Sequence, residues 1–115
     1  MTLKDSGTRQ TYDSGMVREP ESGKPRFDLC VPLNLPFDEQ MLTRFAMQMA
    51  KGADKYDPRN WEQAHTQDEL DRYRSSAFRH FMQWFNGEDD EDHAAAVYFN
   101  LMAAETVKYR IKVAK

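Results

Sequence analysis

The side chains of this 115-residue chain that could do chemistry fall into three clusters, and the first is the stretch KYDPRNW. It holds two cations, an amide and two aromatic rings around a proline. Arginine binds phosphate through paired hydrogen bonds, lysine binds it as a point charge, and an aromatic ring can stack on a base. The stretch therefore predicts a nucleotide-binding loop, although an ordinary surface loop could have the same composition. Its candidate ligand-binding residues are Lys55, Arg59, Asn60 and Trp61.

The second cluster is centred on Arg79 and His80 in a segment with helical periodicity. Arg72, Ser76 and Arg79 are spaced so that they share one face of a helix. A histidine beside them can donate to a phosphate or act as an acid near neutral pH. We therefore expect Arg79 to bind ligand and His80 to be catalytic, with a solvated or core-edge histidine as the alternative.

The third cluster is the acidic run from Glu88 to Asp92, followed by His93. Magnesium takes oxygen ligands, keeps several waters and needs only one or two carboxylates when a substrate supplies phosphates. The run thus predicts a magnesium site in which Asp92 binds the ion together with Glu88 or Asp89, with Asp92 and His93 as catalytic candidates. Acidic residues at a helix N-terminus also offset the helix dipole, which is the structural alternative.

Asn100 is the one amide in an otherwise apolar helical stretch. Left without hydrogen-bond partners, such an amide costs about 1–3 kcal/mol when buried. His93 lies two helical turns before it and faces the same way. We expect Asn100 to bind ligand in a site shared with His93, or else to bond another helix.

Three helices should position these clusters. The first is expected from about Asp38 to Lys51, where apolar residues recur at helical spacing and Gly52 follows as a helix-ending residue. The second should begin near Thr66 and end at Asn86-Gly87, with an apolar stripe that includes Phe81 and Trp84. The third should open with the acidic run and reach about Val113. It is apolar nearly all round from residue 94 to 104, which is typical of a buried central helix.

These elements predict an all-α fold, a small bundle of about three helices with an extended, proline-containing N-terminal arm. Residues 1–23 carry few large apolar side chains and should form a flexible or extended arm, and 24–115 should form one helical nucleotide-binding domain. Residues 24–36 contain three prolines and are expected to be an irregular strap, or one short strand. Because three helices make a thin bundle around a central one, we also expect a homo-oligomer.

Composition limits the classes of partner. A net charge of −3 gives no general attraction to nucleic acid or to an anionic membrane, so we expect neither as a partner. The single cysteine, Cys30, cannot form an internal disulfide, and no long apolar stretch or signal sequence is present. We therefore expect a soluble, cytoplasmic protein in which any anion site is a local group of cations.

Several catalytic motifs are missing from the sequence. None of the three histidines is followed by aspartate, so there is no histidine–aspartate dyad of the HD phosphohydrolase type. There is also no glycine-rich Walker loop, no HExxH and no pair of cysteines for zinc.

Four separated motifs resemble the dATP/dGTP diphosphohydrolase N-terminal domain family, which is common in phages and prophages. The motifs lie in the family's order between about residues 14 and 106. They are GKPRFDL from Gly23, GADKY with RNWE from Gly52, SAFRH with GE from Ser76, and EDHAAA with NL from Glu91.

The resemblance implies magnesium-dependent cleavage of a purine deoxynucleoside triphosphate to monophosphate and pyrophosphate. It adds Lys24 and Arg26 to the expected phosphate ligands. It also adds Glu91 to the expected magnesium ligands, which are then Glu88, Glu91 and Asp92. Longer relatives carry a second, MazG-like domain, whose sites resemble a helical ExxE pair followed by ExxD. Here Glu88 and Glu91 imitate the first pair, and no ExxD follows.

Because the acidic set departs from the MazG pattern, two alternatives stay open. One is a non-catalytic phage protein that binds or sequesters a nucleotide, including a nucleotide signal of the host. The other is a structural or interaction protein that uses its arm and acidic helix start to contact a partner.

Overall fold

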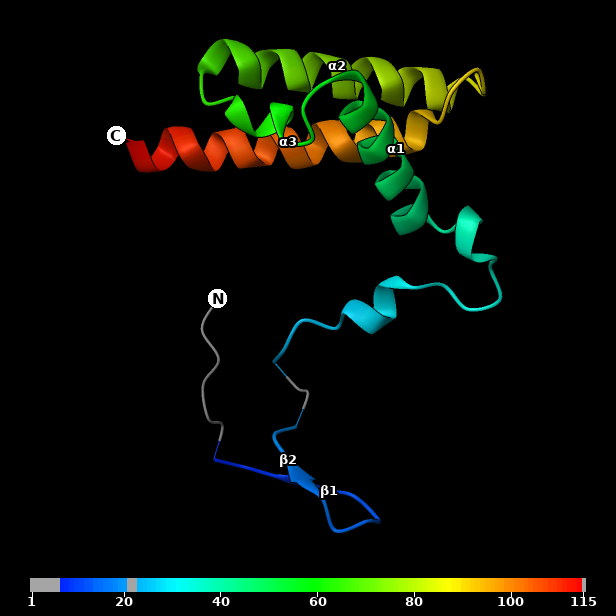
Figure 1. The fold of residues 1–115 in the computed structure, drawn as a ribbon, viewed down its shortest axis with the longest axis vertical. Coiled ribbons are helices and arrows are strands. Elements are labelled where there is room, and N and C mark those ends of the chain that lie inside the picture. The colour runs from blue at the N-terminus through cyan, green and yellow to red at the C-terminus, as the bar shows by residue number, and fades with distance from the viewer. Residues whose placement is uncertain (1–6, 21–22, 115) are drawn as a thin grey trace. The chain divides into compact units, whose positions relative to one another are not determined.

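The computed structural model describes residues 7–20 and 23–114, and its contacts divide the chain into two units, Met1–Pro32 and Leu33–Lys115. The first unit carries a short hairpin and one helical turn. The second carries the helices α1 (Met41–Lys55), α2 (Gln67–Phe85) and α3 (His93–Ala114) (Figure 1). The expected small helical bundle with an N-terminal arm is confirmed. No helix in the described residues is long and apolar enough to cross a membrane.

The arm contains a two-stranded hairpin. β1 (Gln10–Thr11) pairs antiparallel with β2 (Val17–Arg18), and Gln10 lies opposite Arg18. The connection turns at Gly15, whose φ of 91° is one that residues with a side chain rarely adopt. A hydrogen bond of 2.8 Å from the Tyr12 amide to the Met16 carbonyl closes the loop. Part of the expected extended arm is therefore paired.

The proline-containing strap forms a helical turn and no strand. Residues Phe27–Cys30 make a 3-10 helix, and Arg26 donates two hydrogen bonds, of 2.9 and 2.6 Å, to the Asp28 carboxylate. A strand needs a neighbouring strand to satisfy its backbone groups, and Pro32 has no amide hydrogen to offer one. Local hydrogen bonds therefore outweigh the alternating apolar pattern.

Helix α1 spans Met41–Lys55, later than expected at both ends. Asp38 lies in a separate 3-10 turn, Phe37–Glu39, and Gln40 is the N-cap residue of α1. Gly52 lies inside the helix and does not end it, because three residues that tolerate helical geometry follow. Lys55 completes the last turn, where a positive charge is favoured by the helix dipole.

Helix α2 spans Gln67–Phe85 and has the ends that the sequence predicts. Thr66 and Glu69 form a reciprocal capping box. The Glu69 amide donates to the Thr66 hydroxyl at 3.2 Å, and the Thr66 amide donates to the Glu69 carboxylate at 3.0 Å. After the helix, Gly87 adopts a φ of 81° and lets the chain reverse toward α3.

Helix α3 spans His93–Ala114, so the acidic run precedes the helix and does not form its first turn. Only Asp92 caps it: its Oδ1 accepts a 3.0 Å hydrogen bond from the Ala95 amide. The residues from Glu88 to Glu91 belong to the connection between α2 and α3.

The core lies between α2 and α3, which run antiparallel, while α1 packs on α3 (Figure 1). Ala95, Ala96 and Ala103 are at most 1% exposed, so small side chains let the helices approach closely. Leu70, Ala104 and Val107 form an apolar cluster with Ala64. The central helix is not covered on all sides in this single chain, because Tyr98 and Leu101 are about half exposed.

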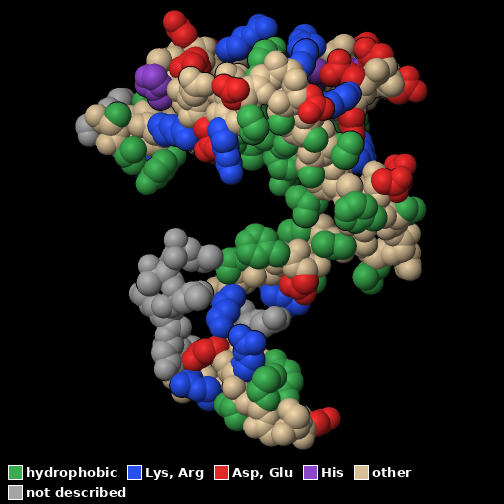
Figure 2. Space-filling view, viewed as in Figure 1, with side chains coloured by type: hydrophobic (Ala, Val, Ile, Leu, Met, Phe, Trp, Pro, Cys, Tyr) green, Lys and Arg blue, Asp and Glu red, His purple; other side chains and the backbone are tan. Residues whose placement is uncertain are grey.

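Large apolar side chains also lie on the surface of the chain (Figure 2). On α2, Phe81 and Trp84 are exposed, although the sequence places them on the core stripe. Their ring centroids are 5.7 Å apart, and Phe85 stacks on Phe81 at 6.4 Å. Together with the exposed Phe78 they form a surface that we call the α2 aromatic patch.

Candidate functional site

A cavity of about 920 Å³ lies within the helical unit. The second half of α1 and the loop after it form one side, and α2, α3 and the α2–α3 connection complete the wall. Gln48, Lys51 and Lys55 from α1 line it because residues three, four and seven apart share a helix face. This size is within the range of pockets that hold nucleotide-sized ligands.

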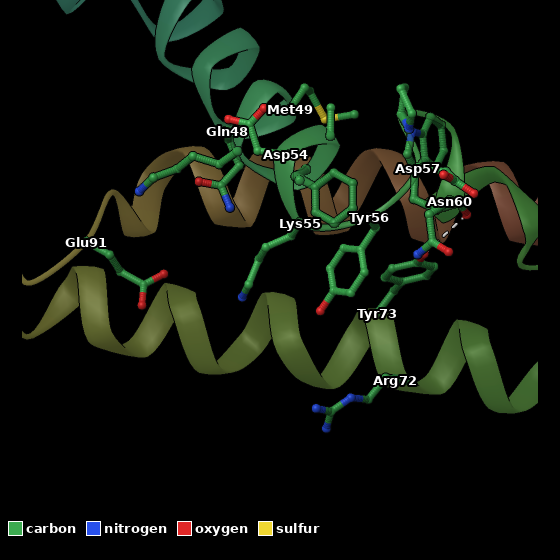
Figure 3. A pocket seen from close by; sticks show the side chains of 16 residues that line it. Gln48, Met49, Asp54, Lys55, Tyr56, Asp57, Asn60, Arg72, Tyr73 and Glu91 are labelled. Carbon is green, nitrogen blue, oxygen red and sulfur yellow. Dashed lines mark hydrogen bonds between the residues drawn. The ribbon is translucent and has the colours of Figure 1, made fainter.

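Three cations line the cavity. Lys51 and Lys55 come from α1, and Arg72 comes from α2. Figure 3 shows Lys55 extending from the end of α1 beside Tyr56, and its Nζ lies 5.9 Å from the centre of the Tyr56 ring. The lining also holds three carboxylates, of Asp54, Asp57 and Glu91. Formal charges therefore balance, and a polyanion would be attracted only where the cations are grouped.

Aromatic side chains give the cavity a rigid wall. Phe99 of α3 meets the rings of Trp61 and Tyr73 edge-on, with centroids 6.2 and 6.0 Å apart. The Tyr73 hydroxyl donates to the Trp61 carbonyl at 3.3 Å, and burial raises the pKa of Tyr73. Tyr56 is 59% exposed, so its ring is accessible to a base that could stack on it.

The expected loop ligands are only partly brought to this cavity. Lys55, Asn60 and Trp61 line it. Arg59 is not among the lining residues; its side chain is 81% exposed and donates to Glu62 at 2.6 Å. Two other expected phosphate ligands, Lys24 and Arg26, belong to the N-terminal unit.

Two buried histidines face each other between α2 and the start of α3. Nδ1 of His80 lies 2.9 Å from Nδ1 of His93, and Nε2 of His93 lies 2.8 Å from an oxygen of Asp90. Because a carboxylate accepts, His93 Nε2 carries a proton and its Nδ1 accepts from His80. His80 Nε2 is then free to accept from Arg79 at 3.3 Å. Four side chains thus form one directed hydrogen-bond chain.

Burial lowers the pKa of His80, and the positive charge of Arg79 lowers it further, while Glu91 opposes both effects. The neutral form of His80 is therefore favoured at neutral pH, in agreement with the hydrogen-bond pattern. Arg79 itself donates to Gln83 at 3.1 Å and is not among the residues that line the cavity.

Asp92 is engaged in a structural ion pair. Both of its oxygens accept from Arg44, at 2.7 and 2.8 Å, and these hydrogen bonds hold the pKa of Asp92 below its usual value. In the described residues, Glu88, Glu91 and Asp92 do not form one donor set for a metal ion. Side chains that do converge are His80, Glu91 and His93, and separately Glu88, Asp90 and His93.

Asn100 is buried and donates a hydrogen bond within its own helix. Its Nδ2 donates to the Ala96 carbonyl at 2.8 Å, and the residue does not line the cavity. This local bond accounts for one donor of the amide without a bond to a different helix.

Residues 14–114 match the model of a known family, described as dATP/dGTP diphosphohydrolase, N-terminal. The chain belongs to this family. No curated protein and no solved structure matches the chain. The family match covers α1, α2 and α3, and therefore every residue that lines the cavity. It supports a nucleotide hydrolase role for the chain.

Sequence reasoning missed two of the three cations that line the cavity. The sequence pattern identifies Lys51 only as the end of a helix, and Arg72 only as a residue on the same helix face as Ser76 and Arg79. The spacing of Lys51 and Lys55, four residues apart, was a usable signal that both share a face. That Arg72 meets the same cavity depends on how α2 packs, which no local pattern in the sequence records.

Proposed function

We propose that this domain binds a purine deoxynucleoside triphosphate, dATP or dGTP, in the cavity and cleaves it to the monophosphate and pyrophosphate. The observation that carries the proposal is that three cations, Lys51, Lys55 and Arg72, line one cavity together with the exposed ring of Tyr56. Cations suit the phosphates and the ring suits the base. Family membership supports the same substrate class.

The protein's own contribution to such a reaction is positioning and charge neutralisation. Lys55 and Arg72 approach from two different helices, so they can hold neighbouring phosphates in a fixed relation. Asn60 and Trp61 border the same space and would orient the nucleoside. Holding the triphosphate in one geometry lowers the entropic part of the barrier.

The three expected catalytic residues lie in two different environments. His80 and His93 form a buried hydrogen-bond chain that could carry a proton, and Glu91 lies next to it while lining the cavity. Asp92 would act by positioning, since Arg44 occupies both of its oxygens.

Magnesium remains a prediction from the acidic run and from the resemblance. Of its three expected ligands, Glu91 is the one that lines the cavity. Magnesium usually enters such sites with the substrate phosphates and needs few protein ligands. When bound it would neutralise phosphate charge.

The test is incubation of the pure chain with dATP, dGTP and other purine nucleotides in the presence of magnesium, followed by denaturation and chromatography of the supernatant. We expect monophosphate and pyrophosphate from dATP or dGTP. Arg72→Gln should lower turnover at least tenfold, while Arg74→Gln, an exposed arginine on the same helix that does not line the cavity, should leave it unchanged. Absence of turnover by the wild type would remove the enzymatic proposal.

A second candidate function is nucleotide capture without chemistry. It is favoured by the engagement of Asp92 with Arg44 and by the lack, among residues 7–20 and 23–114, of a donor set that unites the three expected carboxylates. Such a phage protein could sequester a nucleotide, including a signal nucleotide of the host. Recovery of intact bound nucleotide after denaturation, with calorimetric binding and no turnover, would establish it. No binding across the panel would refute both candidates.

A further inference from the structure

The two histidine side chains between α2 and α3 are almost fully enclosed. Their side chains are 10% and 1% exposed, for His80 and His93 respectively. Their Nδ1 atoms lie 2.9 Å apart, and an oxygen of Glu91 lies 3.9 Å from the His80 Nδ1. All three donor atoms are within 4.8 Å of one another. Two imidazole nitrogens and one carboxylate oxygen therefore converge on one small volume.

These separations are close to those around a single metal ion. A transition metal holds imidazole nitrogen at about 2.0–2.1 Å, so two such nitrogens stand about 2.8–3.0 Å apart at right angles and about 3.3–3.4 Å apart at the tetrahedral angle. The two Nδ1 atoms need to separate by only a few tenths of an ångström. Glu91 is 46% exposed, so its carboxylate can rotate toward the ion without disturbing the core.

We propose that His80, His93 and Glu91 form a binding site for a divalent transition-metal ion such as Zn²⁺. The ion replaces the hydrogen bond between the two histidines and is held by both Nδ1 atoms and a carboxylate oxygen. Two imidazoles and one carboxylate are a donor set of catalytic zinc sites and leave further coordination positions open.

Asp90 supplies the support that a metal-bound histidine requires. It accepts from His93 Nε2 at 2.8 Å, and this contact fixes the tautomer in which His93 Nδ1 keeps its lone pair for the ion. At His80 the matching change is that Nε2 gains a proton and no longer accepts from Arg79. The Arg79 side chain lies at the surface and can move away.

The donor atoms of this site suit a transition-metal ion better than they suit magnesium. Magnesium demands oxygen ligands and seldom takes imidazole, whereas imidazole suits zinc, copper, iron and nickel. The other converging group, Glu88 with Asp90 and His93, offers only one imidazole and two exposed carboxylates. It would also have to break the hydrogen bond from His93 Nε2 to Asp90.

The site adjoins the cavity through Glu91, which belongs to both. The cavity lining carries equal numbers of cationic and anionic side chains, so a bound divalent ion would turn its wall positive at that point. The metal proposal does not rest on the nucleotide proposal, because the ion binds through side chains of the chain alone.

The test is metal binding by the full chain without nucleotide. After treatment with a chelator, the protein is titrated with Zn²⁺ by calorimetry and with Co²⁺ by visible absorption. We expect one ion per chain. His80→Gln, His93→Gln and Glu91→Gln should each weaken binding at least tenfold, and Asp90→Asn about tenfold through loss of support. Since His80 and His93 are buried, circular dichroism is recorded for each variant, and the exposed Glu91 keeps the test valid if either histidine variant unfolds.

The third histidine of the chain provides the matched control. His65 is exposed and contacts the Gln63 carbonyl at 3.0 Å, away from the histidine pair, so His65→Gln should bind zinc as the wild type does. Absence of stoichiometric binding overturns the proposal. So does a loss of affinity in Glu88→Gln equal to that in Glu91→Gln, because the ion would then occupy the other group. Zinc binding without nucleotide turnover would refute the proposed hydrolysis and leave the metal site standing.

Discussion

Arg44 on α1 and Asp92 at the start of α3 are joined by two hydrogen bonds, of 2.8 Å from Nε and 2.7 Å from Nη2. The two residues are 48 positions apart in the sequence, and each side chain is 32% exposed. Asp92 also caps α3 through the Ala95 amide. The Asp92 carboxylate therefore both caps α3 and pairs with a side chain of α1. Helix α1 in turn supplies two of the three cations that line the cavity.

Breaking this pair should destabilise the helical unit. We expect Arg44→Gln or Asp92→Asn to lower the free energy of unfolding by about 1–3 kcal/mol, because a two-point, charge-assisted bond that is partly buried is lost. Urea denaturation measures the change. As a control, Arg59→Gln removes an exposed ion pair with Glu62 and should cost less than about 1 kcal/mol. Equal effects of Arg44→Gln and Arg59→Gln would contradict the assigned role.

Stability should fall in acid partly through Asp92. Its pKa is lowered in the folded state, first by the hydrogen bonds from Arg44, so the unfolded state binds the proton more readily. The contribution is thus fully present above the unfolded pKa of about 3.9 and is lost as pH falls through the folded pKa. Thermal unfolding from pH 7 downward should show a flatter pH dependence for Asp92→Asn than for the wild type below about pH 5. Identical slopes would show that Asp92 is not the group responsible.

The start of α2 should depend on Thr66. Its hydroxyl accepts from the Glu69 amide, and removing a capping side chain typically costs about 1 kcal/mol. Thr66→Ala should therefore lower the unfolding free energy by about that amount in chemical denaturation. Ser75→Ala, at an exposed position inside the same helix, should be neutral or slightly stabilising because alanine favours helix. A neutral Thr66→Ala would mean that the Thr66 hydroxyl does not stabilise the helix start, which the Glu69 carboxylate would then hold through the His65 and Thr66 amides.

Affinity for a triphosphate should follow the residues that line the cavity. Lys55→Gln should weaken dGTP binding about five- to tenfold in calorimetry, and added salt should weaken the wild type for the same electrostatic reason. Arg59→Gln distinguishes the sequence-based expectation, in which Arg59 binds phosphate, from the arrangement in which it pairs with Glu62. Lys112→Gln, an exposed lysine near the end of α3, serves as the control for lost charge. If all three variants bind alike, the cavity is not the phosphate site.

Self-association, expected from the thin bundle, should involve the α2 aromatic patch. Phe78 and Phe85 are 68% and 71% exposed, a large apolar area for a small chain. Sedimentation analysis should give an oligomer for the wild type and a shift toward monomer for Phe78→Glu. Lys108→Glu, on the surface of α3, is the control for the altered charge. A monomeric wild type would refute the expected homo-oligomer.

Local signals were enough to predict much of the helical unit. Thr66 with Glu69 marks the beginning of α2, and Gly87 marks its end, because a capping box and a positive φ are properties of a few neighbouring residues. The helix end expected at Gly52 is wrong, because glycine permits a helix to end but does not force it to. The strap from residue 24 forms one helical turn and no strand, because its apolar alternation has strand form but a strand depends on a partner that the sequence pattern does not supply.

The sequence by itself determined the residue types of the site, the helix positions of α2 and the family. Tertiary structure decided which of these residues meet. Packing of α1 on α3 pairs Arg44 with both oxygens of Asp92, an expected metal ligand, while packing of α2 on α3 sets His80 against His93. Both contacts join residues on different helices, and their formation depends on the crossing of those helices and on the burial of small alanines between them. The distances between these side chains are set by the packed core, and the spacing of residues along the sequence does not predict them.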